Sequence, residues 1–251
     1  MSQPSIHLHT LTSTDGSATY TSPTSSHTIT SGISYPLEVQ FRSKELPEDT
    51  YIEVILIPHN AVSQVKERHV EEVVRRVLKS IVRGEETPRC MLQCTLQVTD
   101  AEVDESLPGG VKGPGQGGSY LEMLAGAVNC AVAGCLDGGV QMRSVAGAVV
   151  VAVMKDGRVR VWPTLKERKL ARSLHVFAFN TDGHCLLMES EGSFEVEEWE
   201  RAGEAARRVV TGSGTDADVD VDMNEDTQSL LDVMRRAVEA RVEKDGSWKD
   251  D

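Results

Sequence analysis

Apolar and polar residues alternate along two stretches within the first sixty residues, which is the pattern of half-buried β-strands. These stretches are HTITSGISYPLEVQF (27–41) and TYIEVILIP (50–58). A further strand is predicted at CMLQCTLQVTD (90–100). Residues 1–26 are rich in Ser and Thr and leave two readings open, short strands or a loosely ordered arm. For the domain organisation we take the second reading, so the regular domain is expected to begin at residue 27.

Over residues 63–83 the spacing of the apolar residues changes to that of a helix. Seven apolar residues recur on one face, and Gly84 follows where the helix should stop. A second helix is predicted over 119–137, where Ser119 and Glu122 have the spacing of a capping box.

The second half of the chain combines strands and helices in close succession. The nearly continuous apolar run SVAGAVVVAVM (144–154) predicts a strand that is covered on both faces. The elements expected after it are a strand at 158–162, a short helix at 163–173 with a capping box at Thr164 and Glu167, a hairpin at 175–190, and helices at 194–210 and 229–244. This order indicates an α+β fold with mixed sheets packed against helices, a single domain with an internal pseudo-repeat.

Two loops are expected to be flexible. Residues 101–118 contain six glycines and two prolines, and residues 211–226 are strongly acidic. The predicted organisation is therefore a domain at 27–210 that contains the first loop, then the acidic loop, then a C-terminal helix and tail at 227–251.

Composition narrows the functional classes. Hydrophobic residues make up 39% of the chain and charged residues 26%, which is ordinary for a soluble globular protein. No apolar run approaches the roughly 20 residues of a membrane-spanning helix, and the N-terminus lacks the features of a leader, so we expect an intracellular protein. The net charge of −13 argues against a chain that binds nucleic acid by itself through phosphate neutralisation.

Familiar site motifs are absent from the sequence. The five cysteines have neither a CxxC pair nor zinc-finger histidines, so they are expected to be small core residues. The acidic run at 216–226 does not place Gly and Glu where a calcium loop needs them. No histidine pair has zincin spacing and no GxSxG elbow occurs. We therefore predict no metal and no cofactor.

The glycine-rich stretch before the second helix, residues 107–118, poses a sharper question. Unpaired amides and the helix dipole converge at a helix N-terminus and suit an anion. However, neither a Gly-Lys-Ser/Thr sequence nor GxGxxG is present, so the pattern alone does not identify a phosphate site.

A series of motifs, in order, resembles the RNase PH-like family over roughly residues 11–210. The motifs are DGSA (15–18), ISYPLEV (33–39), the helix at 63–83, GGSYLEMLAGAVNCAV with DGGVQMR and AVVVAV (117–153), and VWPTLKERKLARSLHVFAF (161–179). WPT followed by Glu167, with SEGSF downstream, is most similar to the small non-catalytic ring subunits of the eukaryotic RNA exosome. The resemblance implies an RNase PH-like fold.

The resemblance also implies where a catalytic site would lie. Active members are phosphorolytic exoribonucleases that hold phosphate with Thr and Arg of a Gly-Gly-Thr-Arg turn and with an Arg before the first long helix. The matching positions here are Ser119, Tyr120 and about Lys66. A phenol has no charge and no guanidinium fork for phosphate. The family's two catalytic carboxylates correspond to Arg168 and Leu174, which can neither act as a general acid nor hold Mg²⁺.

The implied function is therefore that of a catalytically inactive structural subunit of the exosome core ring, supporting 3′–5′ RNA degradation and rRNA maturation. Implied partners are other RNase PH-like ring subunits, RNA-binding cap subunits, a separate catalytic ribonuclease, and RNA in the central channel, with no membrane. The implied locations are nucleus, nucleolus and cytoplasm. Candidate RNA contacts are Lys66, Arg68 and Lys112.

Two alternatives remain open. One is an active phosphate-dependent 3′–5′ exoribonuclease, alone or through a composite site with a paired subunit. The other is an independent RNA-binding module, which the acidic charge disfavours.

Overall fold

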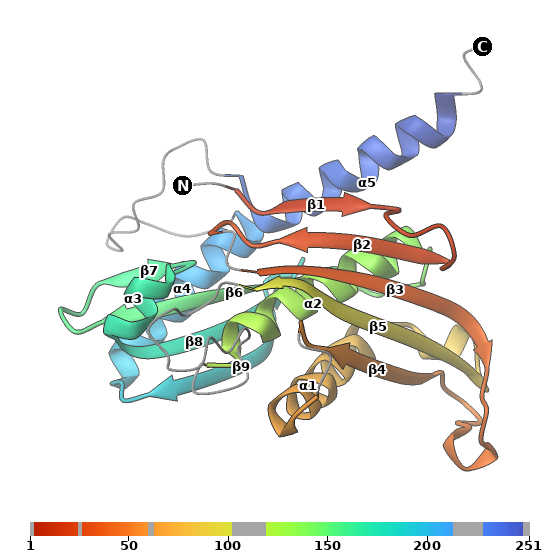
Figure 1. Cartoon of the computed structure of the whole chain (residues 1–251), viewed down its shortest axis with the longest axis horizontal. Helices are drawn as coiled ribbons and strands as arrows, with labels where there is room; N and C mark the ends of the chain where they lie inside the picture. Colours follow the sequence, from red (N-terminus) through yellow and green to blue (C-terminus); the bar gives the residue numbers. More distant parts are fainter. Residues whose placement is uncertain (1–2, 25–26, 60–62, 102–118, 213–227, 248–251) are drawn as a thin grey trace.

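The computed structural model describes residues 3–24, 27–59, 63–101, 119–212 and 228–247, which form two β-sheets packed with helices (Figure 1). The strands are β1 (Ser5–Leu8), β2 (Gly16–Thr21), β3 (His27–Glu38), β4 (Tyr51–Ile57), β5 (Cys90–Ala101), β6 (Ala146–Met154), β7 (Val159–Val161), β8 (Ala171–Asn180) and β9 (Cys185–Gly192). The α-helices are α1 (Val65–Ile81), α2 (Leu121–Asp137), α3 (Leu165–Leu170), α4 (Val196–Thr211) and α5 (Leu230–Gly246), and two short 3₁₀ turns lie at Arg42–Lys44 and Gly84–Glu86.

The first sheet has the strand order β1-β2-β3-β5-β4. All neighbours are antiparallel except β4 and β5, which are parallel because α1 carries the chain from one to the other. Alternate residues of β3, including Ile29 and Ile33, are fully buried, and the residues between them are half-exposed. One face of this sheet therefore packs on α1 and α2, as the alternating pattern predicts.

The N-terminal residues belong to this sheet. β1 pairs with β2 and β2 with β3, while Ala18 and Tyr20 are buried on the covered face. On the other face, the Thr19 and Thr30 hydroxyls lie 3.1 Å apart in a hydrogen bond across the strands. The expected loosely ordered arm is thus wrong for the described part of residues 1–26, and the boundary predicted at residue 27 falls inside a sheet.

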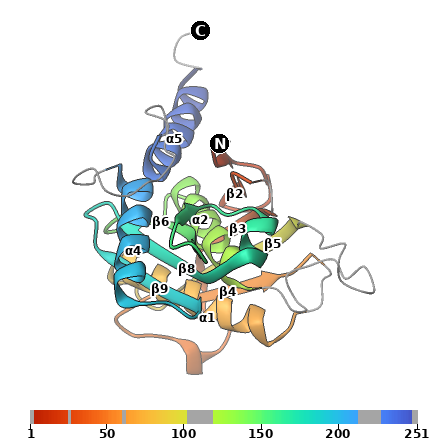
Figure 2. The ribbon, with the colours of Figure 1, turned by 90° about the vertical axis from the view of Figure 1, so that its left-hand side faces the viewer.

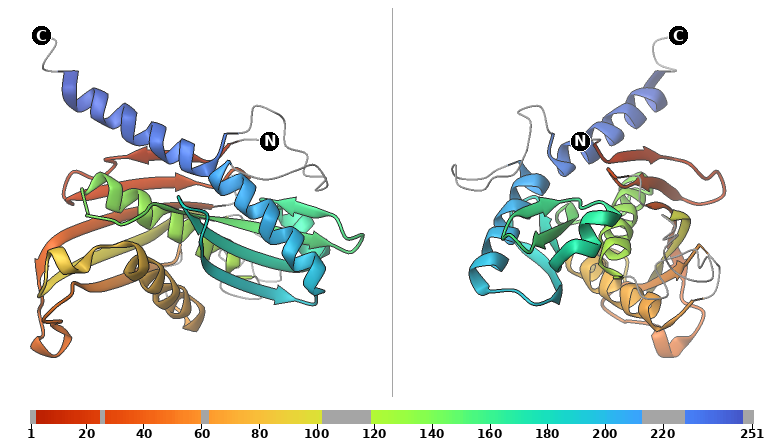
Figure 3. Two further views of the ribbon diagram at one scale, coloured as in Figure 1. Left: turned by 180° about the vertical axis from the view of Figure 1, so that it is seen from behind. Right: turned by 60° about the vertical axis from the view of Figure 1, so that its left-hand side comes forward.

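The second sheet has the order β7-β6-β8-β9. Eight of the nine residues of β6 are buried, because α2 covers one face and α4 the other. Figure 3 shows α4 lying across this sheet. The apolar run at 144–154 therefore forms the doubly covered strand that its pattern predicts. β8 begins at Ala171, earlier than the predicted hairpin, and Gly183 makes the turn to β9 with a φ of 78°.

Helix α2 lies between the two sheets and is buried along nearly all its length. It approaches β2 and β3 closely, since a Cβ on Gly134 would lie 2.5 Å from the Ser31 Oγ. On its other side the Asn129 side chain donates to the Ala148 carbonyl (2.8 Å) and accepts from the Ala148 N–H (2.7 Å). Strand β7 pairs with β6 only from Val151 to Val153, so it does not reach Ala148. The Asn129 side chain therefore supplies the partners that the buried Ala148 N–H and carbonyl need. The two sheets and α2 thus make one domain.

The expectation for the cysteines holds for three of the five. Cys94, Cys130 and Cys135 are buried, and burial raises the pKa of Cys130 and of Cys135 to about 12. Cys90 is half-buried and Cys185 is exposed at the start of β9, so the prediction of a core residue is wrong for Cys185.

Helix α5 extends away from the rest of the molecule at its C-terminal end (Figures 1 and 2). Its N-cap is Ser229, whose hydroxyl accepts from the Asp232 N–H (3.1 Å), and Leu230 and Met234 are buried. The two loops predicted to be flexible lie outside the described residues apart from Ala101, Thr211 and Gly212, so their flexibility remains a prediction. Within the described part of the chain, no helix is both long enough and apolar enough to span a membrane.

Candidate site at the start of helix α2

The described site residues come from the segment before α2 and from three further elements. Ser119 and Tyr120 precede the helix, Lys66 and Arg68 lie in the first turn of α1, and Arg168 is in α3. The remaining two predicted positions are Leu174, which lies in β8, and Lys112, which is outside the described residues.

Tyr120 connects α1, α2 and β9. Its ring makes an edge-on contact with His69 of α1, with 5.3 Å between the ring centroids, and its hydroxyl donates to Glu189 of β9 (3.4 Å). Burial raises the pKa of Tyr120, and the nearby Glu189 and Glu191 carboxylates raise it further. The phenol is therefore uncharged at neutral pH.

Arg168 forms an ion pair with Glu122 in the first turn of α2. Their side chains are only 16% and 14% exposed, so the pair is largely shielded from water. The Glu122 carboxylate also lies 3.7 Å from the imidazole of His27 in β3. The guanidinium of Arg168 is thus held by a carboxylate of the chain itself.

The capping box predicted at Ser119 and Glu122 is wrong. The helix begins at Leu121, and the Ser119 hydroxyl accepts from the Leu121 N–H (3.2 Å). The Glu122 carboxylate pairs with Arg168 and approaches His27. The same spacing is correct at Thr164 and Glu167, which form both bonds of a capping box.

Two of the other predicted positions, Arg68 and Leu174, make contacts of a structural kind. The guanidinium of Arg68 is 2.8 Å from Glu71, whose second oxygen accepts from the Leu56 N–H in β4 (2.9 Å). Leu174 is half-buried, packs against the core and lies opposite Glu191 of β9.

Four residues of the site were not predicted as functional positions: His27, His69, Glu122 and Glu189. His69 is three residues after Lys66 on α1, so helical spacing could have indicated a shared face. The contacts of Glu122 and Glu189 depend on the pairing of distant elements, for which the local sequence carries no signal.

Two features of the arrangement concern the binding of phosphate or a metal. The predicted phosphate turn carries a phenol, and the guanidinium of Arg168 is paired with Glu122. No cluster of three or more potential metal ligands occurs in the described ranges.

Comparisons with known proteins place this geometry in context. No family model matches the chain. The exosome complex component RRP46 of Saccharomyces cerevisiae is 26% identical over 191 residues, which are 73% of this chain and 79% of the yeast protein.

The similarity to solved structures extends further. The crystal structure of rice (Oryza sativa) Rrp46 matches 95% of both chains with a TM-score of 0.72 and 19% identity. An archaeal exosome core matches 82% of this chain and 83% of its own with a TM-score of 0.59 and 12% identity. The Archaeoglobus fulgidus exosome with RNA bound to the active site matches 82% of this chain and 85% of its own, with a TM-score of 0.60 and 11% identity. These matches show that the chain has the RNase PH-like fold of exosome subunits.

Proposed function

Because the chain resembles the Rrp46-type exosome subunits in both sequence and fold, we propose that it is a non-catalytic subunit of an exosome core ring. The single observation that carries this proposal is the structural match to rice Rrp46 over 95% of both chains. The match extends over nearly the whole of both chains, so it is not confined to the core.

The lack of catalysis is inferred from three positions. Tyr120 offers an uncharged phenol where active relatives of the family would offer a guanidinium. Arg168 and Leu174 take the places of two carboxylates, and both have structural partners, Glu122 for the arginine and the core for the leucine. Arg168 and Leu174 have no carboxylate oxygen to bind Mg²⁺, and neither can replace a carboxylic acid as the proton donor.

The proposed partners are other RNase PH-like ring subunits, RNA-binding cap subunits and a separate catalytic ribonuclease that receives RNA through the central channel. The processes are 3′–5′ RNA decay and rRNA maturation in nucleus, nucleolus and cytoplasm. Lys66, Arg68 and Lys112 are proposed to contact RNA phosphates. For Arg68 this is compatible with its ion pair, because its side chain is 67% exposed.

Affinity purification tests the ring assignment. We expect the tagged full-length chain, expressed at its natural level in its own cells, to bring down other RNase PH-like chains in near-equal amounts. An untagged strain processed in parallel is the control. Recovery of the chain without any other RNase PH-like protein would overturn the proposal.

A product assay tests the lack of catalysis. We expect purified chain, incubated with poly(A), inorganic phosphate and Mg²⁺, to release no ADP above a heat-inactivated control. ADP release by the chain alone, or by a purified pair only when this chain is present, would establish the rival function of an active or composite phosphorolytic site. A positive control with any active phosphorolytic exoribonuclease excludes a failed assay.

A further inference from the structure

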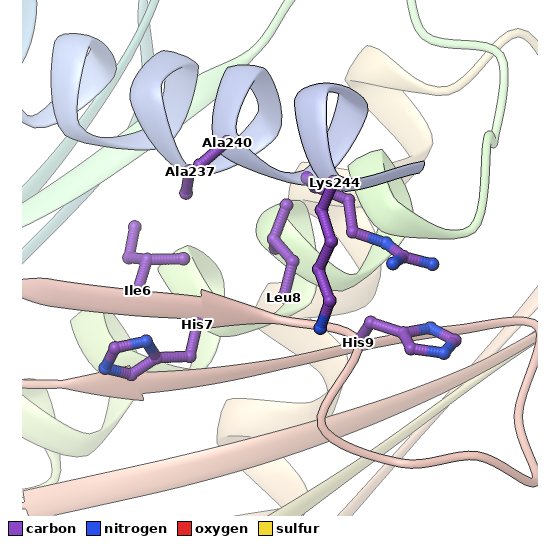
Figure 4. A pocket seen from close by; sticks show the side chains of 8 residues that line it. Ile6, His7, Leu8, His9, Ala237, Ala240 and Lys244 are labelled. Carbon is purple, nitrogen blue, oxygen red and sulfur yellow. The ribbon is translucent and has the colours of Figure 1, made fainter. Parts of the chain in front are cut away.

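The two sheets end in four edge strands, β1, β4, β7 and β9. An edge strand has backbone N–H and C=O groups that point out of the sheet, where a further strand can pair with them. Three of these edges are covered, guarded or short. Helix α5 packs on β1, whose Ile6 and Leu8 point toward it (Figure 4). Lys44 pairs with Glu53 of β4 (2.9 Å), and β7 has only three residues.

Strand β9 is the long edge without such protection. Its eight residues include no Lys, Arg or Pro, which are residues that keep natural edges from pairing. Within the described part of the chain, β8 is the only strand that pairs with it. Met188 in the middle of β9 is 55% exposed, and Phe194, just after the strand, is 40% exposed. As far as the structure describes the chain, the outer edge of β9 is therefore open to a further strand.

One face of this edge is apolar. Met188 lies opposite Phe177 of β8, and the Phe177 ring contacts Trp199 of α4 with 5.7 Å between the ring centroids. Residues directly opposite each other on paired strands share a face, so Met188 lies on the face that α4 covers. Phe194 contacts His175, two residues before Phe177 in β8, and therefore lies on the same face.

The opposite face of the edge is acidic. Glu189 and Glu191 follow Met188 by one and three positions, so their side chains point to the other side of the sheet. There Glu189 accepts from the Tyr120 hydroxyl (3.4 Å), and the charges of both carboxylates raise the pKa of Tyr120. Both glutamates are half-exposed, and neither forms an ion pair with any described residue. Their negative charge is thus available to a partner.

We propose that β9 is the docking site for an extended segment of a partner protein in which basic and apolar residues alternate. A strand added to an edge pairs through its backbone and directs successive side chains to opposite faces. The basic side chains of the segment would lie beside Glu189 and Glu191. Its apolar side chains would lie beside Met188 and Phe194. The charge complementarity selects a basic segment over an acidic one.

A second copy of this chain is a poorer fit to the edge. Two copies paired through β9 would bring Glu189 and Glu191 against the same residues of the partner, and like charges on adjoining strands are unfavourable. Residues 158–161 of the chain do alternate Arg and Val, but β7 has three residues and β9 has eight. The proposal concerns the isolated chain and does not depend on ring assembly.

Fluorescence anisotropy on the isolated full-length chain tests the proposal. The probe is a labelled octapeptide that alternates arginine and valine, matched in length to β9. Its control contains the same residues as four arginines followed by four valines. We expect the alternating peptide to bind about tenfold more tightly, because only alternation places both kinds of side chain on their matching faces. Equal binding of the two peptides would overturn the proposal.

A charge reversal tests the acidic face. We expect Glu191→Lys to weaken binding of the alternating peptide by about tenfold, because attraction becomes repulsion. Glu243→Lys is the matched control, since it makes the same change at an exposed residue near the end of α5 that extends away from the rest of the molecule (Figure 1). Circular dichroism should show that both variants are folded. Equal weakening by the two variants would contradict the assigned face.

Selective N-methylation of the peptide tests pairing with the strand edge. In an added strand the amides of alternate residues face β9, and those between them face solvent. We expect methylation of one set, either all arginine or all valine amides, to weaken binding by about tenfold and methylation of the other set to leave it unchanged. Equal effects of the two methylations would rule out strand addition. Self-association of the chain that Glu191→Lys abolishes, measured by sedimentation, would identify a second copy as the occupant and overturn the proposed partner.

Discussion

At the scale of single residues, His175 shows how the second sheet fixes a protonation state. The residue is fully buried, and its ring nitrogens lie 2.9 Å from the Ser173 hydroxyl and 2.8 Å from the Ser190 hydroxyl. Phe194 contacts the ring edge-on. Burial lowers the pKa of His175 to about 4, against a smaller opposing effect of the Glu198 charge. The imidazole is therefore neutral in the folded protein at pH 7.

This lowered pKa predicts a loss of stability in mild acid. Between pH 6.5 and 4 the unfolded chain binds a proton at His175 that the folded chain does not. The free energy of unfolding therefore decreases as the pH falls through this range. We expect the free energy of unfolding in urea to fall by about 2 kcal/mol more between pH 7 and pH 4.5 in the natural chain than in His175→Gln. An equal fall in both proteins would contradict the assigned pKa.

Single residues also mark the limit of what the sequence predicts. The same spacing of three positions forms a capping box at Thr164 and Glu167 but not at Ser119 and Glu122. The difference lies in Arg168 and His27, which are distant in sequence and close to Glu122 in space. Local spacing predicts a local bond only when no distant residue competes for the same carboxylate.

At the scale of elements, α2 depends on glycines that let it approach the first sheet. A Cβ on Gly134 would lie 2.5 Å from the Ser31 Oγ and 2.9 Å from the Ile33 Cγ1. Ser31 cannot move freely, since its hydroxyl donates to the Cys130 carbonyl (2.9 Å). On α4, by contrast, a Cβ on Gly203 would meet only the Phe177 ring, at an ordinary contact distance of 3.6 Å.

Alanine at these two helical glycines should therefore have opposite effects. We expect Gly134→Ala to lower the free energy of unfolding by about 1–3 kcal/mol, because overpacking outweighs the gain in helix propensity. Gly203→Ala should raise it by about 0.5–1 kcal/mol, since the propensity gain meets no clash. Urea unfolding followed by circular dichroism measures both. Stabilisation by Gly134→Ala would show that the helix can move away from β3.

Most elements could be predicted from periodicity, because each regular segment repeats its pattern over several residues. Helix α1 matches its predicted range within two residues at each end, and β6 lies within the predicted apolar run. β1 and β2 were harder to predict because their outward faces carry Ser and Thr, and their strand character depends on pairing with β3. The contact of Tyr120 with His69 and Glu189 likewise depends on tertiary packing.

At the scale of the whole molecule, α2 joins the two halves into one structural unit. It packs on β2 and β3 of the first sheet and on β6 and β8 of the second, and its own surface has no large exposed face. Neither sheet can lose α2 without exposing a buried apolar surface to water. The expected pseudo-repeat therefore takes the form of two sheets, unequal in strand number, that share one central helix.

This shared helix predicts a single cooperative unfolding transition. Trp162 and Trp199 pack against the core on the side of the second sheet, so tryptophan fluorescence reports on that half, whereas far-UV circular dichroism reports on both. In a Trp248→Phe background, which removes the tryptophan outside the described residues, we expect the two probes to give the same urea midpoint. Any opening of one half would expose α2 and so destabilise the other half. A fluorescence transition at lower urea than the circular dichroism transition would show instead that the second sheet unfolds first.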